Sequence, residues 1–323
     1  MNFQKINESG VMEGFCIIRA IEVKTTSKGS QYLDLSIADN DGDTVAKFWD
    51  YKDTPANHFE IYDFVKVRGT FVPFNDTLQF RIDRIRKVTA DDGVNIDDYV
   101  PSSCLPGDFM LSEIKQIVET FEDEDFKKLV FCIFNKYEEQ LVYWPAAKNM
   151  HHAVRGGLLM HTLSILRLCK AVCNIYTYLN YDLLCTGAIL HDVTKILEIQ
   201  SNECGVPGDY TVKGNLLGHL VMGAMEVDRT GRELEISEDK LILVEHMLIS
   251  HHGKFEFGAA KLPAFAEALV LSMLDDMDAK LYMTNEAVSK AQVGDFSQKV
   301  WALDNRLMFR HELENNGGVN LED

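Results

Sequence analysis

The sequence lacks any C-x-x-C pair, and it contains only seven cysteines in 323 residues. Their odd number and largely apolar neighbours argue against a disulfide framework, because a free cysteine in such surroundings acts as a small hydrophobic residue. We therefore expect a protein of a reducing compartment, without structural disulfides.

Long hydrophobic runs are also missing. Runs such as Leu129–Phe134 are far shorter than the roughly 20 residues that span a bilayer, and the N-terminus has no apolar core of a secretory signal. We expect a cytoplasmic protein with no membrane partner. The sequence also lacks a G-x-S-x-G nucleophile motif and a Walker A loop, which argues against serine hydrolases and P-loop enzymes.

Positive charge is scarce. Lys and Arg number 32 against 50 Asp and Glu, which gives a net charge of −18 and argues against a protein that coats nucleic acid indiscriminately. The acidity is uneven, since residues 1–90 carry 12 basic and 13 acidic side chains, whereas residues 91–323 carry 20 and 37. This difference predicts two units of different character.

What is present is ordinary globular composition, with 46% apolar and 25% charged residues. In Gln31–Ala38, apolar and polar residues alternate with the period of a half-buried strand. Similar runs cover Phe15–Lys24, Thr44–Trp49, Phe64–Val72 and Thr77–Arg86, and Asp41-Gly42 suits a hairpin turn. Residues 1–90 are therefore expected to form a small antiparallel barrel, either an OB-fold or an SH3-like barrel.

Residues 91–107 are polar and contain Pro and Gly, which predicts a linker. From residue 108 to 323 the apolar residues recur with helical spacing, and we expect helices over 159–178, 181–200, 214–228, 237–251 and 263–284. The expected fold class is multidomain α and β, with a small N-terminal barrel followed by an all-α domain and a C-terminal helical extension.

Histidines are concentrated in the helical part. Eight of the ten lie between residues 151 and 252: His151, His152, His161, His191, His219, His246, His251 and His252. A single histidine on an apolar helix is usually a hydrogen-bonded core residue, but eight with acidic partners favour a metal centre.

The most specific local signal is His191-Asp192 in an apolar helix. A buried imidazole beside a carboxylate needs a partner, and a cation such as Mn, Fe, Zn or Mg provides one. Lys195 shares their predicted helix face. It could neutralise a phosphate, or it could simply pair with Asp192.

The order His161, His191-Asp192, Asp275 resembles the HD phosphohydrolase superfamily. Residues 145–153, 157–161, 214–219, 250–254, 278–280 and 302–306 are similar to the YhaM-type 3′-to-5′ exoribonucleases, which also carry an N-terminal OB-fold. The resemblance covers nearly the whole chain. One departure is Thr194, where proteins of this type usually have glycine.

The resemblance implies that His161, His191, Asp192 and Asp275 hold a divalent metal, and that His219, His251 and His252 could hold a second ion. It implies catalytic roles for Lys195, His219 and His251 on the phosphate. Mn²⁺ is the expected ion, with Mg²⁺, Co²⁺ and Fe²⁺ left open, at one or two ions per subunit. Asp278, three residues after Asp275, could orient a ligand.

The predicted function is metal-dependent 3′-to-5′ exoribonuclease activity on single-stranded RNA, with single-stranded DNA left open, by a metal-activated hydroxide that releases nucleoside 5′-monophosphates. Family members assemble, so we expect a homo-oligomer. The barrel should bind the strand through Tyr32, Lys47, Phe48, Trp49 and Arg68. The alternatives are an HD-type nucleotide or cyclic-dinucleotide phosphohydrolase and a non-catalytic single-strand-binding adaptor.

Overall fold

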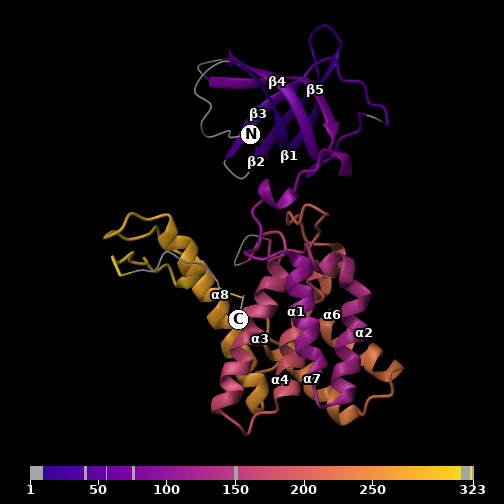
Figure 1. Cartoon of the computed structure of the whole chain (residues 1–323), viewed down its shortest axis with the longest axis vertical. Helices are drawn as coiled ribbons and strands as arrows, with labels where there is room; N and C mark the ends of the chain where they lie inside the picture. Colours follow the sequence, from indigo (N-terminus) through magenta and orange to yellow (C-terminus); the bar gives the residue numbers. More distant parts are fainter. Residues whose placement is uncertain are drawn as a thin grey trace. The chain divides into compact units, whose positions relative to one another are not determined.

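The computed structural model describes residues 10–39, 42–55, 57–74, 77–148, 152–313 and 321. The chain divides into two compact units, residues 1–102 and 103–323. The first unit is built of strands and the second of helices (Figure 1). Each unit has its own hydrophobic core. The structure confirms the expected small N-terminal barrel followed by an all-α domain. After Ser289, the described residues up to 313 contain a short 3₁₀ helix and isolated β-bridges and no α-helix, so they do not show the expected helical extension.

The first unit is a closed barrel of five strands: β1 (Val11–Thr25), β2 (Gln31–Asp39), β3 (Gly42–Phe48), β4 (Phe64–Phe74) and β5 (Thr77–Lys87). The strand order is β1-β2-β3-β5-β4, with β3 and β5 parallel and the other pairs antiparallel. This is an OB-type barrel, which decides between the two predicted alternatives. Asp41 of the predicted turn lies outside the described residues, but β2 and β3 pair up to Asp39 and Gly42.

The stretch 91–107, predicted as a linker, is divided between the two units. The Tyr99 ring lies 5.8 Å from that of Phe15 and 5.3 Å from that of Phe64, so residues up to 102 belong with the barrel. From Ser103, whose backbone N–H donates to the carbonyl of Arg155, the chain belongs with the helices. The division depends on packing between aromatic rings that are far apart in the sequence. The polar composition of the stretch therefore does not predict it.

The second unit contains eight α-helices: α1 (Gly107–Glu119), α2 (Glu124–Leu141), α3 (Gly157–Ile175), α4 (Tyr181–Leu190), α5 (Lys195–Glu198), α6 (Val212–Glu233), α7 (Glu238–Ser250) and α8 (Ala266–Ser289). The count refers to the described part of the chain. Every residue of α3 from Gly157 to Leu166 is buried, and α3 packs against α1, α4 and α8.

By length and composition alone, α3 could cross a membrane, although Arg167 and Lys170 interrupt its apolar run. In the structure, 56% of the apolar window is buried within the protein. That burial is typical of a core helix, and it places His161 in the centre of the unit.

Two breaks in helical geometry lie next to functional residues. The predicted helix over 181–200 is wrong, since α4 ends at Leu190 and Lys195 N–H donates to the Asp192 carbonyl in a tighter turn. In α6, Gly218 has φ 71° and ψ 161°, a conformation that only glycine adopts readily. The breaks set the directions of His191-Asp192 and of His219.

Candidate metal centre

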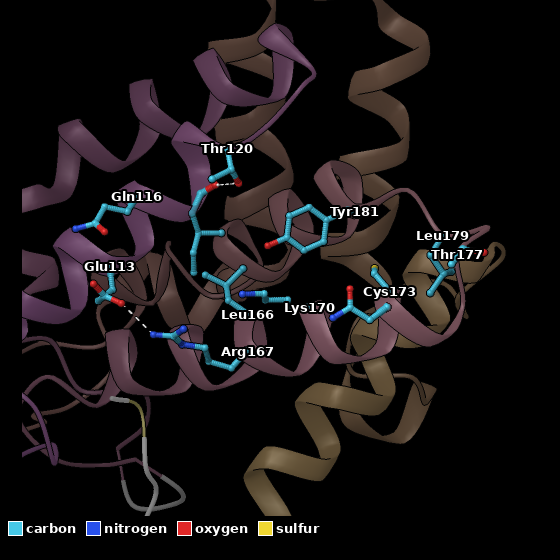
Figure 2. A pocket seen from close by; sticks show the side chains of 12 residues that line it. Glu113, Gln116, Thr120, Leu166, Arg167, Lys170, Cys173, Thr177, Leu179 and Tyr181 are labelled. Atoms are coloured by element: carbon cyan, nitrogen blue, oxygen red, sulfur yellow. Dashed lines mark hydrogen bonds and ion pairs between the residues drawn. The ribbon is translucent and has the colours of Figure 1, made fainter. Parts of the chain in front are cut away.

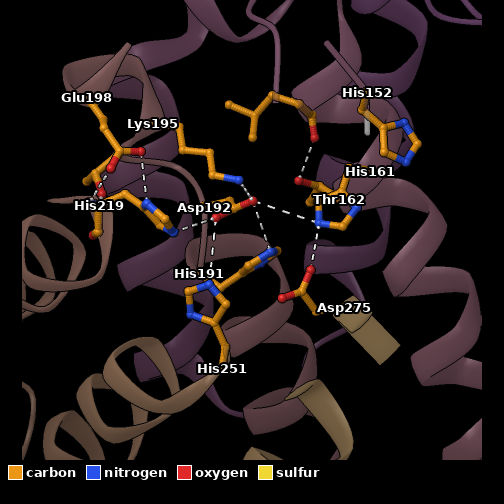
Figure 3. Close-up of polar contacts among 12 residues, drawn as sticks. His152, His161, Thr162, His191, Asp192, Lys195, Glu198, His219, His251 and Asp275 are labelled. Carbon is orange, nitrogen blue, oxygen red and sulfur yellow. Dashed lines mark hydrogen bonds and ion pairs between the residues drawn. The ribbon is translucent and has the colours of Figure 1, made fainter. Parts of the chain in front are cut away.

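Five segments of the helical unit bring histidines and carboxylates to one point. They are α3 with His161, the α4–α5 turn with His191 and Asp192, α6 with His219, the end of α7 with His251 and His252, and α8 with Asp275 and Asp278. Figure 3 shows His161, His191, His219, His251 and Asp275 converging around Asp192. Residues far apart in the sequence therefore form one cluster.

Asp192 is the centre of the cluster and is 2% exposed. Its Oδ2 lies 2.6 Å from Lys195 Nζ and 3.3 Å from His191 Nε2. Its Oδ1 lies 3.3 Å from His219 Nε2 and 3.8 Å from His251 Nε2, and His161 Nε2 is 3.8 Å from Oδ2. Four imidazoles thus turn the same nitrogen towards one carboxylate.

The opposite ring nitrogen of each of these histidines is held by the protein. The Nδ1 contacts are His161 to Asp278 at 2.7 Å, His191 to the Ala188 carbonyl at 2.8 Å, His219 to Glu198 at 2.9 Å, and His251 to the Leu248 carbonyl at 2.7 Å. A neutral imidazole that donates from Nδ1 presents a lone pair at Nε2. This arrangement fixes the tautomer that binds a metal.

Several of the inward atoms have no hydrogen-bond partner in the described part of the chain. They are Nε2 of His191, His219 and His251, and Oδ1 of Asp192, all buried. Leaving a buried polar atom unsatisfied costs about 1–3 kcal/mol. Four such atoms around one point fit a cation, and a mixture of imidazole and carboxylate suits divalent first-row metals.

The potential ligands form overlapping sets of three, each with ligand atoms within 4.8 Å of one another. Three of the four sets are His161, His191 and Asp192; His191, His251 and Asp275; and His219, His251 and His252. The fourth, His152, His161 and Asp278, shares His161 with the first. Because neighbouring sets share His191 or His251, the cluster has donors for one ion or two.

The electrostatics of the cluster favour a positive charge. Burial lowers the pKa of His161, but hydrogen bonds to Asp275 and Asp278 outweigh it and raise that pKa to about 10. Burial raises the pKa of Asp192, yet Lys195 and the surrounding histidines hold it well below its usual range. The carboxylates are therefore ionised at neutral pH, and they attract either a proton or a metal cation.

Two acidic residues bind the ring nitrogens of His161 and His219 that face away from Asp192. Asp278 accepts hydrogen bonds from His161, from His152 at 2.8 Å and from the Ser164 hydroxyl. Glu198 accepts from the Nδ1 of His219 and, at 3.1 Å, from its backbone N–H. Sequence reasoning found Asp278 through its helical spacing from Asp275. It missed Glu198 and Ser164, because nothing local links them to their partners.

The cluster is not uniformly buried. His161, His191 and His251 are at most 1% exposed, whereas Lys195 is 9% and the Asp275 side chain 15% exposed. Lys195 is paired with Asp192, as one of the two sequence alternatives proposed. Of the other predicted histidines, His246 accepts from the Ala264 N–H outside the cluster, and His151 lies outside the described residues.

The predicted strand-binding residues of the barrel do not all lie together in the structure. The Tyr32 and Trp49 rings stack at 4.5 Å, and Lys47 Nζ lies 5.4 Å and 5.7 Å from their centroids. Phe48 packs against the barrel core instead, because successive residues of a strand face opposite sides. Arg68 is on β4, away from this stack in the strand order.

Comparison with known proteins gives the family. The 3′-5′ exoribonuclease YhaM of Listeria welshimeri is 33% identical over 303 residues, which cover 94% of this chain and 96% of the relative. That of Bacillus subtilis is 32% identical over 299 residues, 93% and 94% of the two chains. The chain belongs to the YhaM family. The predicted resemblance is confirmed.

Family models and solved structures match parts of the chain. The HD domain family matches residues 158–280, and TraI_2, a family with the description "Putative helicase", matches residues 108–180. A replication protein A heterotrimer bound to single-stranded DNA aligns with 26% of this chain and 62% of its own, at 19% identity and TM-score 0.22. The second OB-fold domain of replication protein A from Methanococcus maripaludis aligns with 25% and 85%, at 19% identity and TM-score 0.19.

Thr194 stands where proteins of the YhaM type usually have glycine. It is fully buried, and its hydroxyl donates a 2.9 Å hydrogen bond to the carbonyl of His219. The threonine therefore links the His191-Asp192 turn to α6. The structure accommodates this side chain without removing any of the inward-facing donors.

Replacing Asp278 with asparagine should weaken metal binding in this YhaM-family protein. The amide cannot accept from His152, His161 and Ser164 as the carboxylate does, so His161 loses its fixed orientation. Loss of such a supporting carboxylate costs roughly 10–100-fold in metal affinity. We expect the Mn²⁺ concentration for half-maximal activity to rise by this factor while the KM for RNA stays constant. An unchanged metal requirement would contradict the role.

A separate hollow of about 690 Å³ lies along α1, α3 and the start of α4. Figure 2 shows its lining, which includes the ion pair between Arg167 and Glu113 at 2.9 Å. None of its lining residues is a histidine or belongs to the Asp192 cluster. The hollow therefore has no part in the chemistry expected of a YhaM-family site.

Proposed function

We propose that this chain is a metal-dependent 3′-to-5′ exoribonuclease that hydrolyses single-stranded RNA to nucleoside 5′-monophosphates. The observation that carries the proposal is the ring of buried, inward-facing donors around Asp192, in a chain that aligns with YhaM relatives over more than nine-tenths of its length. Single-stranded DNA is a second substrate to be tested.

His161, His191, Asp192 and Asp275 are the proposed ligands of a first divalent ion, with Mn²⁺ as the proposed metal. His219 and His251, with His252 beside them, are the proposed ligands of a second. Metal ions at such a site lower the pKa of a bound water and neutralise charge on the phosphate, which is most of what phosphodiester hydrolysis requires.

The protein's own side chains supply position and charge. Lys195 is held by Asp192, and although burial lowers its pKa, Asp192 outweighs this effect and raises it, so the ammonium stays protonated at neutral pH. It lies on the less buried side of the cluster with Asp275, where it can neutralise an incoming phosphate. His219, held by Glu198, keeps its Nε2 directed at the same place.

The barrel offers a place for the strand. The stacked pair of Tyr32 and Trp49, with Lys47 over both rings, combines an aromatic surface with a cation, as single-strand-binding barrels do. Such a surface binds bases without reading their sequence. It gives a reason for an enzyme with a small reaction centre to carry a second domain.

Trp49→Ala should weaken binding of single-stranded RNA by about tenfold or more. Trp49 is 40% exposed, and stacking on one aromatic side chain is worth roughly 1–3 kcal/mol per base. Fluorescence anisotropy with a labelled 20-mer in a chelator, where the strand stays intact, measures the effect. Ile61→Ala, which removes an exposed apolar side chain from the same unit, is the control. Equal affinities of both variants would contradict the stacking role.

We also propose that the chain forms a homo-oligomer. The segment from the end of α8 onward exposes large apolar side chains: Leu281, Val293, Phe296, Trp301, Leu307 and Phe309, with Trp301 71% exposed. Clustered apolar exposure of this kind is typical of contacts between subunits. Light scattering of the purified chain measures its mass, and a strictly monomeric mass would contradict this proposal.

One experiment tests the function and separates it from its alternatives. The purified chain is incubated with Mn²⁺ and a 5′-labelled single-stranded RNA, and the products are resolved at single-nucleotide length. We expect progressively shorter labelled strands and free nucleoside 5′-monophosphates. Intact RNA together with hydrolysis of nucleotides or cyclic dinucleotides would establish the phosphohydrolase alternative. Binding without hydrolysis under several metals would establish the adaptor.

A further inference from the structure

The outer face of β4 and β5 carries four basic side chains in two cross-strand pairs. In the strand register, Lys66 lies opposite Arg86 and Arg68 lies opposite Arg84. The residues between them, Val67 and Ile85, are buried in the barrel core. The four cations, here called the β4–β5 basic ladder, therefore project outward together.

The ladder places like charges where they repel. Like charges directly opposite each other on neighbouring strands destabilise a sheet. Glu13 relieves part of this, at 3.2 Å from Lys66 and 4.0 Å from Arg68, and Asp92 binds Arg86 at 2.6 and 2.7 Å. Within the described ranges, no carboxylate forms an ion pair with Arg84. The four cations of the ladder therefore share two carboxylate partners, those of Glu13 and Asp92, among the described residues.

The ladder lines a hollow rather than a flat surface. A groove of about 500 Å³ runs over it, lined by Glu13, Phe48, Lys66, Val67, Arg68, Asp83, Arg84, Ile85 and Arg86. Alternate residues of a strand are about 6.6 Å apart, so Arg84 and Arg86 repeat their charge along the groove. Repeated cations in a groove match a chain of regularly spaced anions better than a single one.

We propose that the β4–β5 basic ladder binds the phosphodiester backbone of the RNA strand. The inference rests on the proposed function, and it adds a second contact surface to the stacked pair formed by Tyr32 on β2 and Trp49, the residue after β3. RNA is favoured over an acidic protein because the same barrel already displays an aromatic surface for bases. The repulsion between paired cations is then offset when phosphates bind between them.

Binding of a labelled 20-mer RNA to the full chain, measured in a chelator over a series of salt concentrations, tests the ladder. Each phosphate contact contributes about 0.7 to the slope of log affinity against log salt for a single strand. The double variant Arg68→Gln, Arg84→Gln should lower the slope by about 1.4 and the affinity at low salt by about tenfold. The matched variant Arg68→Lys, Arg84→Lys keeps both charges and should keep the slope.

A second readout distinguishes binding from a structural role. Arg84→Gln removes one member of a like-charged pair, so the unfolding temperature at low salt should rise by a few degrees while RNA binding weakens. A fall in unfolding temperature would mean that Arg84 stabilises the barrel. That outcome, with an unchanged salt slope, overturns the proposal.

The failure of this proposal can be told from the failure of the proposed function. If the chain degrades RNA normally and the glutamine variant keeps the wild-type salt slope, the ladder proposal fails and the proposed function stands. If the salt slope depends on the ladder but RNA stays intact in the presence of Mn²⁺, the ladder proposal is supported and the exonuclease assignment fails. If the glutamine variant keeps the wild-type slope but has a lower mass in light scattering, the ladder does not bind RNA and instead contacts another protein surface.

Discussion

Replacing Asp192 with asparagine is expected to reduce kcat/KM for RNA by at least about three orders of magnitude. Asp192 is the carboxylate nearest to Lys195 and to the Nε2 atoms of His219 and His251. The amide has no charge to hold a cation and cannot accept at both positions. Loss of a central ligand removes the metal's charge stabilisation in the transition state, which is the largest contribution in phosphoryl transfer. Gel analysis of 5′-labelled RNA measures the loss.

The control for this variant is Asp276→Asn. Asp276 follows Asp275 on α8, is exposed and pairs with Lys280 at 2.6 Å, so its loss should leave the rate within about twofold.

Because Asp192→Asn also leaves the buried Lys195 without its counterion, at a cost of about 3–5 kcal/mol, circular dichroism must show that the variant is folded. Asp275→Asn, at a less buried ligand, serves as the second variant. Retention of a tenth of wild-type activity by folded Asp192→Asn would refute the assignment.

Removal of divalent metal is expected to abolish hydrolysis and to destabilise the helical unit. The Nε2 atoms of His191, His219 and His251 have no hydrogen-bond partner among the described residues, and a bound cation would provide one. A ligand present at 100 times its Kd stabilises a fold by about 2.7 kcal/mol, which for a unit of this size corresponds to roughly 5–10 °C in Tm. Thermal unfolding with a chelator and then with Mn²⁺ measures the shift, and an RNA assay measures activity.

The Asp192→Asn variant provides the matched control for metal binding. It should show little of the Mn²⁺-dependent rise in Tm, whereas Asp276→Asn should show all of it. Re-addition of Mn²⁺ to the chelated wild type should restore activity. Full hydrolysis after exhaustive chelation, or equal Tm shifts in both variants, would exclude this cluster as the metal site.

Much of the helical site could be predicted because its chemistry is local in the sequence. His191 and Asp192 are adjacent in the sequence. Asp278 follows Asp275 by three residues, so helical spacing indicates that these two share a face. The supporting contacts could not be predicted in this way. Glu198 meets His219 across 21 residues and Asp278 meets His161 across 117, and only packing of the helices makes them neighbours.

The barrel shows the same division. Alternating apolar residues predict its strands, because one face of each strand must be buried. They do not predict which outward residues meet, since that depends on register. The irregularity between Arg68 and Gly69 shifts the β4–β5 pairing, and the register up to that point sets Arg68 opposite Arg84. Phe48 is partly buried against the barrel core and also lines the groove over the β4–β5 basic ladder, because an aromatic side chain fits a core as well as a binding surface.

The amino-acid sequence alone predicts a β-barrel, an all-α domain and an ordered series of histidines and aspartates typical of a metal centre. Periodicity and adjacency carry that information, because burial acts on each element separately. The tertiary structure decided which ring nitrogens face inward, which carboxylates hold them, where α4 and α6 break, and that four cations share one groove. Those features depend on the convergence of distant elements, which no local pattern encodes.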